Sequence, residues 1–140
     1  MSSRLGVVYS VVILLSIAGI ATSLYISYSR SSLPSFCEIG SEFSCSEVLS
    51  SQYSSFFGIN MEYYGAAWFV VSLVLSVFSL VKTWARTALF GWSVLGLLGV
   101  AYLVYLEVFV INSICVLCTV AHMLGILIFS ASFIGLKYSK

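Results

Sequence analysis

Four cysteines carry the most specific chemistry in this chain, and they occur as two spaced pairs. Cys37 and Cys45 are separated by seven residues, and Cys115 and Cys118 form the motif Cys-Val-Leu-Cys. A C-x-x-C pair closes a very small loop, so its disulfide removes little unfolded-state entropy and is a weak stabiliser. The same spacing is typical of redox pairs, in which one thiol attacks and its neighbour resolves the mixed disulfide. We therefore expect two redox-active pairs.

Two other uses of four cysteines stay open at this point. An even number of thiols in a compartment that permits disulfides could form two structural bonds. Four thiols could also bind a metal ion, although we expect none. In either case the chain would be a non-catalytic membrane protein. Thiol accessibility separates the alternatives, because a zinc site keeps all four thiols reduced and a structural protein keeps all four oxidised.

The composition predicts that lipid surrounds the elements that hold these cysteines. Hydrophobic residues make up 61% of the 140 residues, charged residues only 8%, and the mean hydropathy is +1.10. A soluble domain carries about 25% charged residues. Crossing the hydrocarbon core takes about 20 apolar residues, and four runs qualify: Leu5–Tyr28, Tyr63–Val81, Ala88–Ile111 and Ile114–Leu136.

These runs predict an all-α membrane protein, a bundle of four transmembrane helices forming one domain over residues 1–140. The first run is far longer than the apolar region of a signal peptide, so we expect it to be retained as a helix. The basic residues Arg4, Lys82, Arg86, Lys137 and Lys140 fall on one side of such a bundle, which predicts cytoplasmic termini in a multi-pass protein of the cell membrane. The loop over residues 29–62 and all four cysteines fall on the outer side. No basic stripe favours nucleic acid as a partner.

Helix starts are expected to activate the thiols. Ser113 is a plausible N-cap for the fourth helix, which places Cys115 in its first turn and Cys118 just beyond. The sequence Ser44-Cys45-Ser46-Glu47 has the pattern of a capping box. The positive end of a helix dipole favours a thiolate. A short amphipathic helix flat on the outer membrane surface is expected after Cys45, because apolar residues follow at helical spacing: Val48, Leu49, Tyr53, Phe56 and Phe57.

Two thiol pairs in a membrane need an electron sink, and a lipid-soluble quinone is the obvious one. Cys118 lies one turn deeper than Cys115, so it is the better candidate for contact with the quinone. His122 lies one turn further along the same face. It is expected either to donate a hydrogen bond to a quinone carbonyl or to be satisfied by a neighbouring helix. Asn112 could cap the fourth helix or contact the quinone, and Glu107 is expected to be an interfacial or water-accessible carboxylate rather than a proton relay.

With these motifs in this order, the chain resembles the vitamin K epoxide reductase family over roughly residues 5–136. The resemblance rests on Cys37-x7-Cys45, on Cys45-Ser46-Glu47-Val48-Leu49-Ser50-Ser51, on Phe57-Gly58-Ile59, on Gly65, and on Cys115-Val116-Leu117-Cys118. The bacterial four-helix quinone reductase that reoxidises periplasmic disulfide donors shares this chemistry. Its C-x-x-C pair precedes its loop pair, however, so we do not assign the chain to that family.

The resemblance implies a bundle around a quinone that is closed by the loop helix. It implies that Cys37 and Cys45 are a shuttle pair and that Cys115 and Cys118 are the active-site pair. A thioredoxin-like partner, periplasmic or extracytoplasmic, would donate electrons at Cys37, and the activity would support disulfide formation in exported proteins. Ser50 and Ser51 match a serine pair of the family's loop helix.

The chain departs from the family pattern at several points. Asn60 stands where many bacterial members have proline, and His122 stands where animal members have a tyrosine near the quinone. The fused thioredoxin-like domain of many bacterial members is absent from this sequence, so the partner is expected to be a separate protein. Ubiquinone or menaquinone is expected in place of the epoxide that animal members reduce.

Overall fold

Four long helices dominate the computed structural model, which describes residues 3–140. They are α1 (Ser3–Ser29), α3 (Met61–Ser79), α4 (Thr83–Tyr105), which continues into the π-helical segment η3 (Leu106–Ile111), and α5 (Val116–Tyr138). All four are long and apolar enough to cross a membrane. The predicted all-α membrane bundle is confirmed.

The helix boundaries differ from the predicted ones where polar residues join a helix. The third helix begins at Thr83 rather than Ala88, and thereby includes Arg86. Arg86 is buried, and its Nε donates to the carbonyl oxygen of Ser79 at 2.9 Å. Hydropathy placed this charged residue outside the run, but its hydrogen bond to the end of α3 lets the helix contain it. The fourth helix begins at Val116 rather than Ile114.

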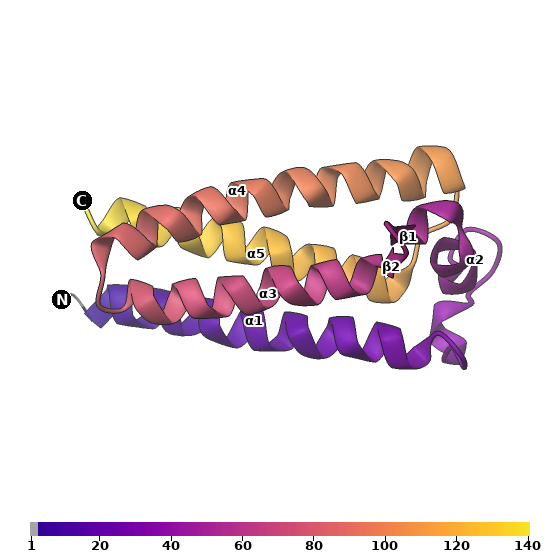
Figure 1. Ribbon diagram of the computed structural model, residues 1–140, viewed down its shortest axis with the longest axis horizontal. Coiled ribbons are helices and arrows are strands. Elements are labelled where there is room, and N and C mark those ends of the chain that lie inside the picture. The colour runs from indigo at the N-terminus through magenta and orange to yellow at the C-terminus, as the bar shows by residue number, and fades with distance from the viewer. Residues whose placement is uncertain (1–2) are drawn as a thin grey trace.

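The helices form one bundle in which α1 packs against α3 and α5, and α4 packs against the same two helices (Figure 1). The start of α1, the α3–α4 turn and the C-terminus lie at one end, which we call the terminal end. The loop between α1 and α3 and the α4–α5 turn lie at the other, the loop end. All four cysteines lie in these two segments or in the first turn of α5.

Small polar residues bring the helices together in the terminal half. Its buried residues include Tyr9, Val12, Leu89 and Ile128, together with serines of every long helix. The Ser16 hydroxyl donates to the Val12 carbonyl oxygen at 2.8 Å, one turn back along its own helix. Ser93 and Ser132 also contact each other at 2.8 Å. Five other buried serines bond back in the same way as Ser16: Ser72, Ser76, Ser79, Ser93 and Ser132. Small residues of this kind allow close helix approach without leaving polar groups unsatisfied.

The loop is built from short elements, and the predicted amphipathic helix is shorter than expected. In order they are η1 (Ser35–Cys37), α2 (Cys45–Ser50), η2 (Gln52–Ser54), β1 (Ser55–Phe56) and β2 (Ile59–Asn60). Strands β1 and β2 form an antiparallel hairpin. Its two turn residues, Phe57 and Gly58, have positive φ values of 53° and 77°. Glycine favours such a turn, and a hairpin with two left-handed turn residues matches the twist of its strands. Phe56 and Phe57 therefore belong to a hairpin and not to a helix.

Candidate functional site

The four thiols form a spatial series at the loop end, in which each thiol contacts the next. Cys37 ends η1, Cys45 begins α2, Cys115 immediately precedes α5, and Cys118 lies one turn into it. Side-chain interactions connect Cys37 with Cys45, Cys45 with Cys115, and Cys115 with Cys118. The first three are fully buried, and Cys118 is partly exposed. Elements far apart in the sequence thus bring both predicted pairs together, with Cys45 and Cys115 in the middle.

The start of α5 differs from the prediction, because Cys115 itself is the N-cap. Its sulfur accepts a hydrogen bond from the Cys118 backbone N–H at 3.3 Å. Ser113, which we expected in that position, instead donates its hydroxyl to the Glu47 carboxylate of α2. A capping sulfur is held in place by the backbone of its own partner cysteine. The C-x-x-C spacing therefore also serves the local geometry of the helix start.

Of the two hydrogen bonds of the predicted capping box at the start of α2, only one is formed. The Ser44 hydroxyl accepts from the Glu47 backbone N–H at 3.3 Å. Glu47 does not reach back to Ser44, as a complete capping box requires, because its carboxylate contacts Ser113. Glu38 accepts from the Ser44 hydroxyl and from the Ser46 backbone N–H, both at 2.9 Å. These bonds, the Ser46 N–H first, lower the pKa of Glu38 and fix the chain around Cys45.

Burial and contacts between the thiols, and not the helix dipole, determine the direction in which the pKa values of Cys37, Cys45 and Cys115 shift. Burial raises the pKa of Cys37 to about 12, with the neighbouring Cys45 thiol adding to the effect. Burial also raises the pKa of Cys45. The pKa of Cys115 is raised by its hydrogen bond with Cys118 and then by burial. The helix dipole, which we expected to favour the thiolate at these positions, is therefore outweighed at Cys115 by the hydrogen bond with Cys118 and by burial, and at Cys45 by burial, which disfavours a charged sulfur.

A cavity of about 270 Å³ opens beside Cys118, between the loop and all four long helices. Cys118 and His122 both line it, as the shared helix face predicted. Asn112 is not among its lining residues. Instead, Asn112 ends η3 in a left-handed conformation, with φ 58° and its N–H donated to the Glu107 carbonyl oxygen. Asn112 therefore caps the preceding helical segment, not the fourth helix as we had considered.

Glu107 is a candidate functional residue whose setting the sequence did not predict. We expected an interfacial or water-accessible carboxylate; Glu107 is only 5% exposed, and it lines the cavity. Its carboxylate accepts from the Cys115 backbone N–H at 3.4 Å and lies 4.0 Å from His122 Nδ1. An ionisable group within a transmembrane run is by default a functional candidate, and that signal was present in the sequence.

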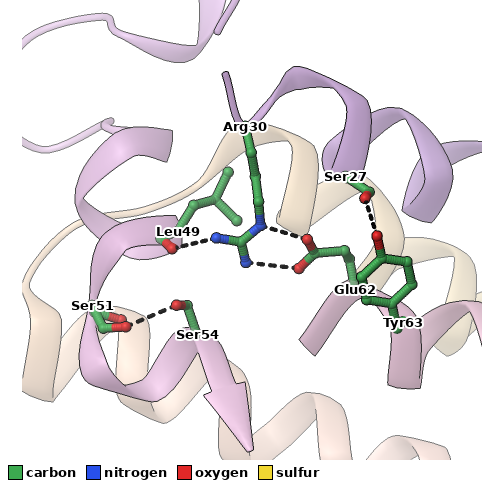
Figure 2. Close-up of polar contacts among 7 residues, drawn as sticks. All are labelled: Ser27, Arg30, Leu49, Ser51, Ser54, Glu62 and Tyr63. Carbon is green, nitrogen blue, oxygen red and sulfur yellow. Dashed lines mark hydrogen bonds and ion pairs between the residues drawn. The ribbon is translucent and has the colours of Figure 1, made fainter. Parts of the chain in front are cut away.

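An ion pair at the mouth of the cavity was also missed. Arg30, at the end of α1, donates through Nε and Nη2 to the two carboxylate oxygens of Glu62, and through Nη1 to the Leu49 carbonyl oxygen at 2.7 Å (Figure 2). Hydrogen bonding to Glu62 raises the pKa of Arg30. Leu49 lies in the last turn of α2, where a cation satisfies free carbonyl groups. One guanidinium thus ties α1, α2 and α3 together.

The remaining polar residues around the loop end have structural contacts. Ser51 lines the cavity, and its hydroxyl donates to the Val48 carbonyl oxygen, whereas Ser50 is exposed. Figure 2 also shows Ser54 donating to Ser51, and Ser27 donating to Tyr63. No group of three or more His, Cys, Asp or Glu side chains among residues 3–140 has an arrangement that could hold a metal ion.

The sequence matches one family model over most of its length. The vitamin K epoxide reductase family model covers residues 10–133, a range that includes all four cysteines and every long helix in whole or in large part. The family is one of membrane oxidoreductases that act on thiols, and the buried thiol pairs beside a cavity agree with that chemistry. This chain belongs to the vitamin K epoxide reductase family.

Proposed function

We propose that this protein passes electrons from a thioredoxin-like partner through its two cysteine pairs to a quinone, and so supports disulfide formation in exported proteins. The observation that carries the proposal is the sequence of four contacting thiols that ends at the cavity. Cys37 belongs to the loop, and Cys118 is the only one of the four that lines the cavity. The inner end of the thiol series therefore lies beside a space for an acceptor, as a relay requires.

Each transfer step is a thiol–disulfide exchange. A partner thiolate attacks Cys37 in a Cys37–Cys45 disulfide, so that a mixed disulfide forms and Cys45 leaves as a thiolate. Cys45 then attacks Cys115 in a Cys115–Cys118 disulfide, and Cys118 leaves as a thiolate beside the cavity. The second partner thiol releases Cys37, which attacks Cys45 and frees Cys115. The partner's dithiol is then a disulfide, and the pair of α5 is a dithiol.

The cavity suits a quinone head group. Its volume of about 270 Å³ is near the lower end of ligand pockets, and its lining is mostly apolar with a few convergent polar groups. Trp68 supplies a flat wall, and its ring can lie against α4 because residue 96 is glycine; a Cβ there would be 2.2 Å from the ring. Cys118 and His122 would face the bound group. A quinone supplies a two-electron acceptor, and we propose ubiquinone or menaquinone.

Quinone reduction by the purified protein tests this function directly. Dithiothreitol or a reduced thioredoxin-like protein serves as donor, and absorbance reports a short-tailed ubiquinone or menaquinone analogue. We expect turnover that Cys115→Ser and Cys118→Ser abolish. Cys37→Ser should lose turnover with the protein donor yet retain part of it with dithiothreitol, which is small enough to reach the inner pair. No quinone reduction by the folded wild-type protein with either donor would refute the proposal.

We also propose that the loop end faces outward and the terminal end faces the cytoplasm. Lys82, Lys137 and Lys140 lie at the terminal end together with Arg4 and Arg86, and basic residues favour the cytoplasmic side. A C-terminal fusion to a reporter that is active only in the cytoplasm should be active. An active C-terminal reporter of the kind that works only outside the cytoplasm would contradict this orientation.

A further inference from the structure

Glu107 is turned into the bundle by an irregular segment of helix. It lies in the π-helical segment η3, and its carbonyl oxygen accepts from the backbone N–H groups of Asn112 and Ser113. Single π-turns within α-helices occur frequently at functional sites. The segment ends in the left-handed residue Asn112. The backbone thus positions a carboxylate inside the membrane-spanning region.

The carboxylate of Glu107 lies between the active-site pair and His122. One oxygen accepts from the Cys115 N–H at 3.4 Å, and the other lies 4.0 Å from His122 Nδ1. The second separation exceeds a hydrogen bond, but a small rotation or one water molecule spans it. Such contacts commonly tighten only when a ligand is bound. His122 makes no hydrogen bond to protein within residues 3–140, and both residues line the cavity next to Cys118.

The other ionisable groups that face the cavity are engaged elsewhere. Arg30 and Glu62 satisfy each other through two hydrogen bonds. The Tyr64 hydroxyl donates to the Phe56 carbonyl oxygen. Tyr53 lines the loop side of the cavity, and Cys118 belongs to the active-site pair. Of the two cavity carboxylates in the described residues, Glu107 is thus the one without an ion pair to arginine or lysine. Burial of such a group is unfavourable without a compensating interaction.

We infer that Glu107 and His122 act as a proton-transfer couple for the reaction at this cavity, an inference that rests on the proposed function. Closure of the Cys115–Cys118 disulfide releases two electrons and two protons, and conversion of a quinone to its quinol takes up the same number. His122 holds a proton on the ring nitrogen directed away from Glu107, toward the cavity. Glu107 takes one of the two protons that the closing thiols release and passes it to Nδ1, so the imidazole donates to the quinone at one nitrogen while it is recharged at the other. The second proton passes from Cys118, which lines the same cavity, to the quinone directly.

Glu107→Gln and His122→Gln test the couple. Glutamine at position 107 keeps an oxygen that can accept from Cys115 N–H but cannot release a proton. Single-turnover oxidation of the dithiol by a short-tailed ubiquinone analogue should slow by about 10²-fold in either variant, as expected for the loss of acid–base catalysis. The double variant should be no slower than the slower single variant, because the two residues act together. Glu42→Gln, on the exposed loop, is the matched control and should behave as wild type.

Two readouts separate a proton role from a merely structural one. The wild-type rate should depend on pH in a way that Glu107→Gln removes, while equilibrium binding of the analogue, followed by tryptophan fluorescence, should change less than twofold. Infrared difference spectra between the oxidised and reduced protein should contain a carboxyl band that Glu107→Gln abolishes and Glu42→Gln preserves. Unchanged rate and pH profile in a folded Glu107→Gln protein, or additive effects in the double variant, would overturn the inference.

Two further outcomes are equally informative. Should Glu107→Gln not fold, His122→Gln must still shift the carboxyl band, and an unshifted band overturns the inference. Wild-type protein that fails to reduce the analogue with dithiothreitol refutes the proposed function itself. Wild-type turnover together with an unchanged rate and pH profile in Glu107→Gln refutes only the proton-transfer couple.

Discussion

Two glycines, one in each half of the bundle, have opposite surroundings. In the terminal half, a Cβ on Gly135 would lie 2.8 Å from both Cζ and Oη of Tyr9, so the ring occupies the space that glycine leaves. In the loop half, a Cβ on Gly99 would meet nothing within 4 Å, although the residue lines the cavity. The same four helices are therefore packed closely at one end and leave a space at the other. At Gly99 the cavity stays open because no neighbouring side chain fills the space beside this residue.

The two halves also differ in how they treat polar groups. Serines in the terminal half are satisfied by their own helices and by each other, as the Ser93–Ser132 contact shows. In the loop half, Glu107 and His122 are buried without such complete partners. This contrast teaches that polarity alone does not mark a site in a membrane bundle. Lack of a partner alone does not mark one either, because the buried Tyr9 hydroxyl has no hydrogen-bond partner in the described residues and lies in the packed terminal half.

The largest effect is expected from breaking the thiol series. The double variant Cys37→Ser, Cys118→Ser leaves Cys45 and Cys115 without their resolving neighbours, and should lose turnover completely. It should accumulate a Cys45–Cys115 disulfide, because these thiols contact each other and a disulfide needs α-carbons within about 7 Å. Peptide mapping after alkylation measures the bond. Cys45→Ser with Cys118→Ser should form far less Cys37–Cys115 bond, and equal bridging in both variants would show that the loop defines no route.

The second effect concerns the covered thiol of Cys37. Its pKa of about 12, against an ordinary 9.0, means that the thiolate fraction at neutral pH is smaller by a factor on the order of 10³. We expect iodoacetamide to modify Cys37 in the reduced, folded protein at a rate that still rises as the pH passes 9.0. Mass spectrometry of the labelled peptide measures it, with denatured protein as the control. A rate that levels off near pH 9 would show that the loop does not bury this thiol in solution.

The third effect concerns His122 alone. His122→Ala should weaken quinone use by about 1–3 kcal/mol, the cost of one hydrogen bond to a bound ligand. Thiol exchange with the partner should stay the same, because Cys37 and Cys45 lie outside the cavity lining. Steady-state kinetics with varied quinone, beside an assay of disulfide transfer to the partner, separates the two. Unchanged quinone kinetics in folded protein would make His122 a structural residue.

The fourth effect is a change of volume at the open glycine. Gly99→Leu should reduce quinone affinity at least about tenfold, or about 1.4 kcal/mol, because the new side chain enters the cavity. Stability should not fall, since leucine favours a helix more than glycine does. Equilibrium binding and thermal unfolding in detergent measure both. Full affinity in this variant would show that the quinone does not occupy the cavity beside Gly99.

The smallest effect on quinone is expected at the packed glycine. Gly135→Ala must displace the Tyr9 ring, so it should destabilise the fold by about 1–3 kcal/mol, as overpacking does. Quinone affinity should remain within experimental error of wild type. Unfolding in detergent and the same binding assay provide the comparison with Gly99→Leu. A reversed outcome, with affinity lost at residue 135 and kept at residue 99, would contradict the division of the bundle into two halves.

Much of the fold was predictable because hydrophobicity alone places four helices in a membrane. The order and sidedness of the cysteines then placed both pairs at one end, and helical periodicity placed His122 one turn after Cys118 on the same helix face. The π-helical turn of η3 was not predictable, because a single extra residue in a turn leaves no periodic signal in an apolar run. Glu107 therefore turned inward where an interfacial position was expected.

Tertiary contacts account for the other differences. The Glu47 carboxylate accepts from the Ser113 hydroxyl instead of contacting the start of its own helix. Cys115, and not Ser113, is therefore the N-cap of α5. The contact between Arg30 and Glu62 joins residues 32 positions apart, and local sequence contains no signal for such a pair. Residues after Ser51 had the spacing of a helix, but Gly58 favours a hairpin turn instead.

The loop is attached to the start of α5 on both sides of Cys45. Before it, Phe43 pairs with Ile114 as a short parallel bridge, in which Ile114 N–H donates to the Glu42 carbonyl oxygen at 2.9 Å. After it, Glu47 accepts from Ser113. For the proposed relay, these attachments give Cys45 a high effective molarity toward Cys115, since most of the entropy of bringing the sulfurs together is lost on folding. Transfer between the pairs is then first-order, and the rate of the whole relay should follow the concentration of partner protein until encounter ceases to limit it.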